Sequence, residues 1–380
     1  MSYARARLWL GISGVGSLVV LSALALTLGW PERLLVGSDG DSVSSMRQFA
    51  GLVVILALWL FPLDFLGGYY LPHRYRRSFS SFRGWFSRYI AGVAVHSGLF
   101  VVFAMLLLVT GRLTGVAGGL AVVVVAMFAC LLIRNLRLEF KAVSTRGTRQ
   151  KLKAIRRTVE ERGIRVPRLF AVRHSDNGYT GGIVGLLSPR IVIPRRWLNS
   201  LTIEQLSTVV ARRSLAIENG SYIRGMLLAA CWNIAGFVIC CSLPGAGLLS
   251  VASLVTTFCW FTLWSFVGLL ILPTLSRRAT LSIDISLNEI GVQPDLIRQT
   301  AASLDRMQDH EPHRSGAIET IFHPLPSVSR RLPVKPIAGL NAWNAARATL
   351  YLSWACFGIL SRAVHCNIGR PELWDMLPTD

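Results

Sequence analysis

The stretch VVARRSLAIENG, residues 209–220, carries two adjacent arginines, Arg212 and Arg213, within a helical pattern. A guanidinium stays protonated at any accessible pH, so it cannot offer a lone pair to a metal or take a proton from water. Its chemistry is the binding of anions such as a carboxylate, a phosphate or a lipid headgroup. The same arginines could instead pair internally with Asp284 or Glu218, or form a solvated basic turn. The residues alone leave these interpretations open.

The residues around this stretch predict a small α+β layer that leads into the helix. Helical spacing marks Lys151–Arg162, and strand-like runs follow at Val166–Arg173 and Arg190–Pro194. The turn-forming cluster HSDNGYTGG lies between the two strands. Thr202 and Gln205 then form a predicted capping box at the start of the long helix that carries the arginines.

The composition places this polar segment in a membrane protein. Of the 380 residues, 52% are hydrophobic and only 16% are charged, which is too apolar for an ordinary soluble domain. The net charge of +20 does not indicate nucleic-acid binding, because the arginines cluster beside apolar runs and no nucleic-acid-binding motif is found. The seven cysteines form no C-x-x-C pair, so they indicate neither a disulfide framework nor a zinc ribbon.

Several apolar runs are long enough to cross a bilayer, which takes roughly 20 residues per helix. The predicted spans are Leu8–Trp30, Ala50–Leu71, Tyr89–Thr110, Thr114–Ile133, Ile223–Leu243 and Gly247–Leu272. We interpret the first as a retained helix rather than a signal peptide, because it is long and lacks an A-x-A exit. A shorter run, Ala348–Leu360, predicts an interfacial or packed helix.

The positions of the arginines predict the orientation in the inner membrane. The loop at residues 73–88 carries five of them and is therefore predicted to be cytoplasmic. The N-terminus and the polar segments at 134–222 and after 273 then lie on the same side, where the two segments can form one domain. Asp64 follows Pro62 near the end of the second span, so we expect its carboxylate to reach water.

Three ordered motifs accompany this layout: GGIVGLLSPRIVIPRRWLNSLTIEQLSTVVA, SRRATLSIDISLNEIG and IFHPLPSVSRRL. The predicted spans 223–243 and 247–272 form a hairpin between the first and the second motif. With this hairpin, the motifs resemble the membrane zinc endopeptidases of the HtpX and CAAX-prenyl-protease type, and the related peptidase domain of β-lactam sensor proteins. The resemblance covers residues 155–332. Together with the apolar runs, which predict about six transmembrane helices, it implies an α-helical polytopic membrane protein with a cytoplasmic α+β zincin-like (gluzincin) domain.

The resemblance assigns the zinc-site positions of that family to residues without metal donors. Its first His falls on Arg212, its general-base Glu on Arg213, its second His on Ala216 and its third ligand, Glu, on Thr280, while the following Asp is retained as Asp284. Catalytic zinc needs three protein donors and a water. Two cations would also repel the ion, by about 4 kcal/mol per unit charge at 4 Å and an effective dielectric constant of 20. We therefore predict no bound metal, and we assign no catalytic residue.

Other positions of the family pattern are retained. Asn177, Gly178 and Tyr179 stand where the resembled family carries its substrate-binding edge strand. His323 and Pro324, with Arg330 or Arg331, match the closing motif, and we interpret His323 as structural. His174, beside the turn cluster, is expected to be solvated.

A further interpretation places a relocated metal site in the segment DHEPHR. It contains His310, Glu311 and His313, but the spacing is H-E-x-H, and Pro312 would break a helix that places both histidines on one face. A polar surface loop is the simpler interpretation of this segment.

These observations predict a pseudopeptidase that binds or scaffolds unfolded or membrane-protein segments, or regulates a partner, in contact with the lipid bilayer. The predicted regions are a four-helix membrane part (1–133), two parts of a peptidase-like domain (134–222 and 273–340), a transmembrane hairpin (223–272) and a C-terminal amphipathic helix with its tail (341–380). One alternative is an active zinc metalloendopeptidase with atypical ligands. Another is a sensor whose membrane half detects an envelope ligand.

Overall fold

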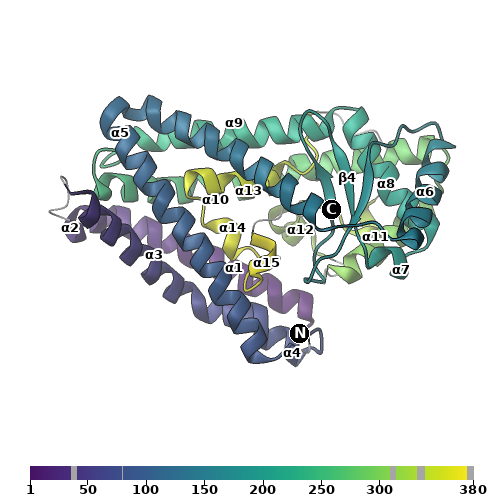
Figure 1. The fold of residues 1–380 in the computed structure, drawn as a ribbon, viewed down its shortest axis with the longest axis horizontal. Helices are drawn as coiled ribbons and strands as arrows, with labels where there is room; N and C mark the ends of the chain where they lie inside the picture. Colours follow the sequence, from purple (N-terminus) through teal and green to yellow (C-terminus); the bar gives the residue numbers. More distant parts are fainter. Residues whose placement is uncertain (36–40, 79, 309–313, 332–338, 375–380) are drawn as a thin grey trace. The chain divides into compact units, whose positions relative to one another are not determined.

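The computed structural model describes residues 1–35, 41–78, 80–308, 314–331 and 339–374, and it is mostly helical (Figure 1). The described chain divides into two compact units. Unit 1 takes in residues 1–130, 230–268 and 350–374, and unit 2 takes in residues 131–229 and 269–349. Each unit is therefore assembled from segments that lie far apart in the sequence.

Unit 1 contains long apolar helices. They begin with α1 (Tyr3–Thr27), the short α2 (Trp30–Leu34) and α3 (Ser42–Phe65), which continues through the π-helical turn Leu66–Tyr70 into α4 (Leu71–Arg74). The helix α5 (Phe82–Phe140) follows, and α9 (Ser221–Cys241) and α10 (Val251–Glu289) contribute their residues 230–241 and 251–268 to the same unit. The side chain of Asp41 begins α3 by accepting the backbone N–H groups of Val43 and Ser44.

Five helices of the described chain are long and apolar enough to cross a membrane, by length and composition: Tyr3–Thr27, Ser42–Arg74, Phe82–Phe140, Ser221–Cys241 and Val251–Glu289. They confirm that the chain is a multi-pass membrane protein, although five helices stand where six spans are predicted. The predicted third and fourth spans both lie in α5, whose helical geometry breaks at Gly115 with φ 66° and ψ −152°. Figure 1 shows α5 doubling back on itself at this bend.

The positive φ at Gly115 explains why the turn is there and not at residues 111–113, where the sequence places it. Left-handed backbone is accessible to glycine but strained for a residue with a Cβ. At 1.5 Å per residue, the arms at 82–114 and 116–140 each exceed the ~30 Å of a hydrocarbon core. The arms are thus long enough for both predicted spans.

The helix α10 runs past the predicted end of the last span at Leu272. It contains Pro273 and continues through the second sequence motif to Glu289. Thr280 and Asp284 therefore lie one turn apart on one face of a continuous helix. This places the two motif positions on a rigid element.

Unit 2 contains a four-stranded sheet in the order β1-β2-β4-β3. Its strands are β1 (Ala142–Val143), β2 (Leu169–Val172), β3 (Gly182–Val184) and β4 (Arg190–Pro194). The central strands β2 and β4 are parallel, with Leu169 opposite Ile191 and Val172 opposite Pro194, whereas the two edge strands pair antiparallel. The predicted strands at 166–173 and 190–194 are confirmed. The edge strands were not predicted because two or three residues are too few to show a period-2 pattern.

Helices α6 (Arg146–Glu160), α7 (Trp197–Ser200), α8 (Ile203–Glu218) and α11 (Pro294–Met307) share a hydrophobic core with this sheet. Ile155, Ile191, Trp197 and Val209 are among its fully buried members. Burial of a side chain of this size contributes about 1.5–3 kcal/mol. The core therefore fixes α8, and the arginines on it, against the sheet.

The remaining short elements are α12 (Gly316–Phe322), the 3₁₀ turn Val328–Arg330, α13 (Ala345–Leu352), the 3₁₀ turn Ser353–Cys356, α14 (Leu360–Ala363) and α15 (Pro371–Trp374). The apolar run predicted at 348–360 is thus divided between α13 and a 3₁₀ turn, and most of its residues are buried. It is packed inside the protein, which was one of the two predicted alternatives.

The predicted capping box at the start of α8 is confirmed, and it yields a test of this helix. The Thr202 hydroxyl accepts the Gln205 N–H, and the Gln205 side chain accepts the Thr202 N–H, both at 3.2 Å. We expect Thr202→Ala to reduce the stability of unit 2 by about 1 kcal/mol, measured by thermal unfolding in detergent. Thr202→Ser retains the hydroxyl and serves as the control. Equal unfolding temperatures for the two variants would contradict the role of the cap.

Candidate functional site

Asp284 is the centre of a buried ionic cluster in unit 2. Its Oδ1 accepts a hydrogen bond from Arg212 Nε at 2.9 Å, and its Oδ2 accepts one from Arg331 Nη1 at 3.0 Å. The exposed fractions are 2% for Arg212, 0% for Asp284 and 5% for Arg331. Helices α8 and α10 therefore supply one charge each, and the segment after the 3₁₀ turn supplies the third.

Two guanidinium groups around one carboxylate leave an excess of positive charge inside the protein. Burial lowers the pKa of Arg331, and the Asp284 carboxylate opposes this shift. Arg212 also lies over the Trp343 ring, with its Cζ 5.5 Å from the ring centroid. Arg212 Nη2 and Arg331 Nε are buried without a hydrogen-bond partner among the described residues. The cluster retains donors for an anion or a water, and neither of its guanidinium groups can accept a proton.

Arg213 has a different set of partners. Its Nη1 donates to the Val192 carbonyl at 2.7 Å and its Nη2 donates to the Thr180 carbonyl at 2.9 Å. Its Cζ lies 5.6 Å from the centroid of the Trp197 ring, and the residue is fully buried. Of the alternatives left open for the two arginines, internal pairing holds for Arg212. Arg213 instead connects α8 to β4 and to the segment before β3.

The other two positions assigned to the zinc site are buried as well. Ala216 contributes its backbone carbonyl to a hydrogen bond from Ser221 Oγ at 3.2 Å. Thr280 is buried on α10, one turn before Asp284. In the part of the chain that the structure describes, no three His, Cys, Asp or Glu side chains gather as metal ligands. The residues at these positions do not fit the zinc of the resembled family, and His310, Glu311 and His313 lie outside the described residues.

The predicted substrate-binding residues lie in a turn that precedes the edge strand β3. Asn177 is exposed, and the Gly178 N–H donates to Asp176 Oδ1 at 2.6 Å. Tyr179 is buried, which raises the pKa of its phenol, and its carbonyl accepts Arg196 Nη2 at 2.5 Å. The strand itself begins at Gly182. Asn177 is thus the most accessible of the three side chains.

The closing motif contributes Arg331 and not Arg330 to the cluster. Arg330 is exposed, and its Nε lies 3.9 Å from Glu319 Oε2. His323 is buried, and its carbonyl accepts Arg277 Nη1 at 2.7 Å. This burial agrees with the structural role predicted for His323. The sequence could not decide between the two arginines, because the choice depends on how the chain turns after residue 328.

The expectation that Asp64 reaches water is wrong. Asp64 is 1% exposed, and its carboxylate accepts Arg362 Nη2 at 2.6 Å, the Gly369 N–H at 2.7 Å and the Tyr89 hydroxyl at 3.3 Å. A carboxylate can stay buried in an apolar unit when a cation and further donors compensate it. Sequence reasoning missed Arg362 because it lies 298 positions later in the chain.

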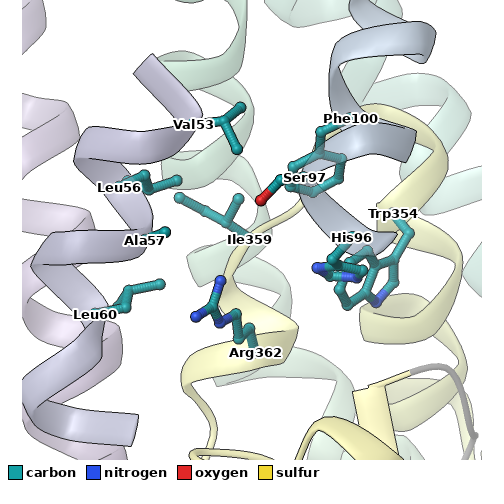
Figure 2. A pocket seen from close by; sticks show the side chains of 10 residues that line it. All are labelled: Val53, Leu56, Ala57, Leu60, His96, Ser97, Phe100, Trp354, Ile359 and Arg362. Carbon is teal, nitrogen blue, oxygen red and sulfur yellow. The ribbon is translucent and has the colours of Figure 1, made fainter. Parts of the chain in front are cut away.

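A cavity of about 20 Å³ adjoins this ion pair in unit 1. Figure 2 shows Arg362 between the apolar side chains of α3, such as Leu56 and Leu60, and the α5 residues His96 and Ser97. A space of this size holds about one water. The cavity beside the ion pair therefore has no room for a ligand larger than a water molecule.

No family model and no curated protein sequence matches this chain. Among solved structures, Ste24p of S. mikatae is similar in fold, with a TM-score of 0.64 and 13% sequence identity, over 82% of this chain and 81% of that chain. This similarity supports the membrane metallopeptidase-like fold of the HtpX and CAAX-prenyl-protease type that the three motifs predict. The relation to β-lactam sensor proteins remains a prediction.

Proposed function

We propose that this chain is a membrane pseudopeptidase, which keeps a metallopeptidase-like fold without peptidase activity and binds or regulates polypeptides. The observation that carries the proposal is the Arg212–Asp284–Arg331 cluster. Its Arg212 stands at the position of the first zinc ligand of the resembled family, and its Asp284 is the retained aspartate that follows the position of the third ligand. An internal ion pair of this kind takes up the only carboxylate that the assigned positions retain.

The donor set supports the loss of the inherited chemistry. Asp284 already accepts two guanidinium groups, and neither Ala216 nor Thr280 offers a donor suited to zinc. Arg213 cannot act as a general base, because a guanidinium has no proton-accepting site and its N–H groups are directed to two carbonyls. Peptide hydrolysis would need a metal site and a base built from other residues.

The turn before β3 supports a role in polypeptide binding. β3 is the last strand in the sheet order, but its residues are buried, whereas Asn177 lies exposed in the turn before it. A polypeptide needs accessible groups to pair with at a sheet edge. We infer that unfolded or membrane-protein segments bind at this turn, through Asn177. The six-span arrangement, the inner-membrane location and the cytoplasmic placement of the polar segments are part of this proposal, supported by the arginines of the 73–88 loop.

The test uses the full chain purified in detergent. We expect far less than one zinc per chain by elemental analysis and no cleavage of casein above the background of a mock purification. One zinc per chain, with cleavage that a chelator abolishes, would refute the proposal. For the binding role, permanently unfolded, carboxymethylated α-lactalbumin should bind in a fluorescence anisotropy assay and native α-lactalbumin should not. Equal binding of the two forms would refute that part alone.

A further inference from the structure

A cleft of about 220 Å³ opens in unit 2, where the parallel strands β2 and β4 end. Val172 and Pro194, the last residues of the two strands, line it together with polar residues that follow them in the chain. The carboxyl ends of parallel strands are a common place for ligands in α/β sheets. The cleft is far larger than the roughly 10–15 Å³ that one water requires. It therefore has room for a small anion with its hydration.

The cleft is basic. Arg173, Arg195 and Arg196 line it, and none of the described residues that line it is acidic. Arg196 is held in place, because it donates to the carbonyls of Asp176 and Tyr179. Arg173 is exposed and Arg195 is half-buried, and neither guanidinium forms an ion pair with a carboxylate in the described part of the chain. Two cations of the cleft therefore remain available to a ligand.

His174 adds a neutral donor to the lining, and it is half-buried where the sequence predicts a solvated residue. Its ring stacks on Tyr179 at 4.3 Å between centroids, and burial lowers its pKa, so the ring is neutral at pH 7. The Asp176 N–H lies 3.1 Å from Nδ1, and a backbone N–H can only donate. Nδ1 must accept, so the proton of the neutral ring is on Nε2. The contact of Nδ1 with the Asp176 carbonyl is longer, at 3.4 Å.

The Nε2–H group is buried without a hydrogen-bond partner among the described residues. A buried donor left unpaired costs about 1–3 kcal/mol, and His174 is one of the residues that line the cleft. The guanidinium groups and this N–H are all hydrogen-bond donors. The paired N–H groups of a guanidinium match the geometry of phosphate and carboxylate oxygens. A phosphate presents more oxygens and more negative charge than a carboxylate, so it satisfies more of these donors at once.

We propose that this cleft binds a phosphate group, held by Arg173 and Arg195 and by the Nε2–H of His174. The group belongs either to a soluble phosphorylated molecule or to a phospholipid headgroup. This site uses residues different from those of the Asp284 cluster, and it does not depend on the proposed loss of peptidase activity.

The first experiment measures binding of inorganic pyrophosphate to the full chain in an uncharged detergent at low salt, by isothermal titration calorimetry. The double variant Arg173→Gln/Arg195→Gln should raise the Kd at least about tenfold, because two charge-assisted contacts are lost. The matched control is Arg165→Gln/Arg168→Gln, which removes the same charge from exposed residues before β2. This control should bind as the wild type does. Equal Kd values for the cleft variant and the control overturn the proposal.

A second variant keeps the test decisive if the double variant does not fold. In His174→Asn, the amide oxygen can still accept the Asp176 N–H, but the Nε2–H donor is lost. The Kd should rise several-fold while the unfolding temperature without ligand stays unchanged. A Kd equal to that of the wild type overturns the proposed role of the histidine and the site with it.

A third measurement identifies the source of the phosphate group. Dihexanoyl phosphatidic acid is compared with dihexanoyl phosphatidylcholine and with pyrophosphate. Tighter binding of phosphatidic acid, lost in the cleft variants, supports a lipid headgroup. Tighter binding of pyrophosphate, lost in the same variants, supports a soluble ligand. If the wild type binds none of these probes, the site does not exist as proposed.

Discussion

Asp284→Ala is expected to reduce the stability of unit 2 by about 3–5 kcal/mol, the typical cost of removing one partner of a buried ion pair. The variant leaves Arg212 and Arg331 buried without the carboxylate that pairs with both of them. The loss is a large fraction of the 5–15 kcal/mol that stabilises a typical domain. Thermal unfolding in detergent and hydrogen exchange of peptides from unit 2 measure the effect.

Two controls separate charge from packing. Asp295→Ala removes an aspartate that is 80% exposed and pairs with Arg298 on the surface, so it should change stability by no more than about 1 kcal/mol. The triple variant Arg212→Met/Asp284→Leu/Arg331→Met removes all charges of the cluster, and should recover much of the stability lost in Asp284→Ala. If Asp284→Ala unfolds at the same temperature as Asp295→Ala, the cluster is not the stabilising element described above.

The second large effect is expected in unit 1. Arg362→Met leaves the Asp64 carboxylate buried with only the Tyr89 hydroxyl and the Gly369 N–H as donors. We expect a loss of about 3–5 kcal/mol. The segment 360–374 should also exchange its amide hydrogens faster, because the ion pair holds it to α3. Hydrogen-exchange mass spectrometry of peptides from this segment gives the measurement.

Asp64→Leu/Arg362→Met is the compensated variant for this prediction, since it removes both charges together. Its stability should exceed that of Arg362→Met. Asp41→Asn changes an exposed aspartate on the same helix and retains an N-cap residue, so it should leave exchange in 360–374 unaltered. Unchanged exchange of this segment in Arg362→Met would show that other contacts hold it in place.

The sequence was sufficient for the features that depend on composition and local pattern. Long apolar runs predicted the membrane helices, and Thr202 with Gln205 predicted the start of α8. The turn of α5 is expected at residues 111–113, but it lies at Gly115. Apolar residues continue on both sides of this glycine, so the hydropathy pattern does not show where the helix bends. The strands β1 and β3 could not be predicted from the sequence. They are strands because they pair with β2 and β4, and their own residues show no strand pattern.

The candidate site was less predictable, because its contacts join distant segments. Pairing of Arg212 with Asp284 was one of several alternatives, and opposite charge alone could not select it. His174 is half-buried and stacks against Tyr179, a contact that a turn-rich sequence does not reveal. The burial of Asp64 depends in the same way on Arg362, a residue from the other end of the chain.

Arg213 shows how a contact can escape detection by comparison of related sequences. Its two acceptors are main-chain carbonyls, which every amino acid possesses. Positions 180 and 192 can therefore drift among side chains of similar size while the contact persists. Substitutions at positions 180 and 192 therefore need not correlate with substitutions at position 213. Methods that infer proximity from co-varying residue pairs would not detect the contacts of Arg213 with these two carbonyls.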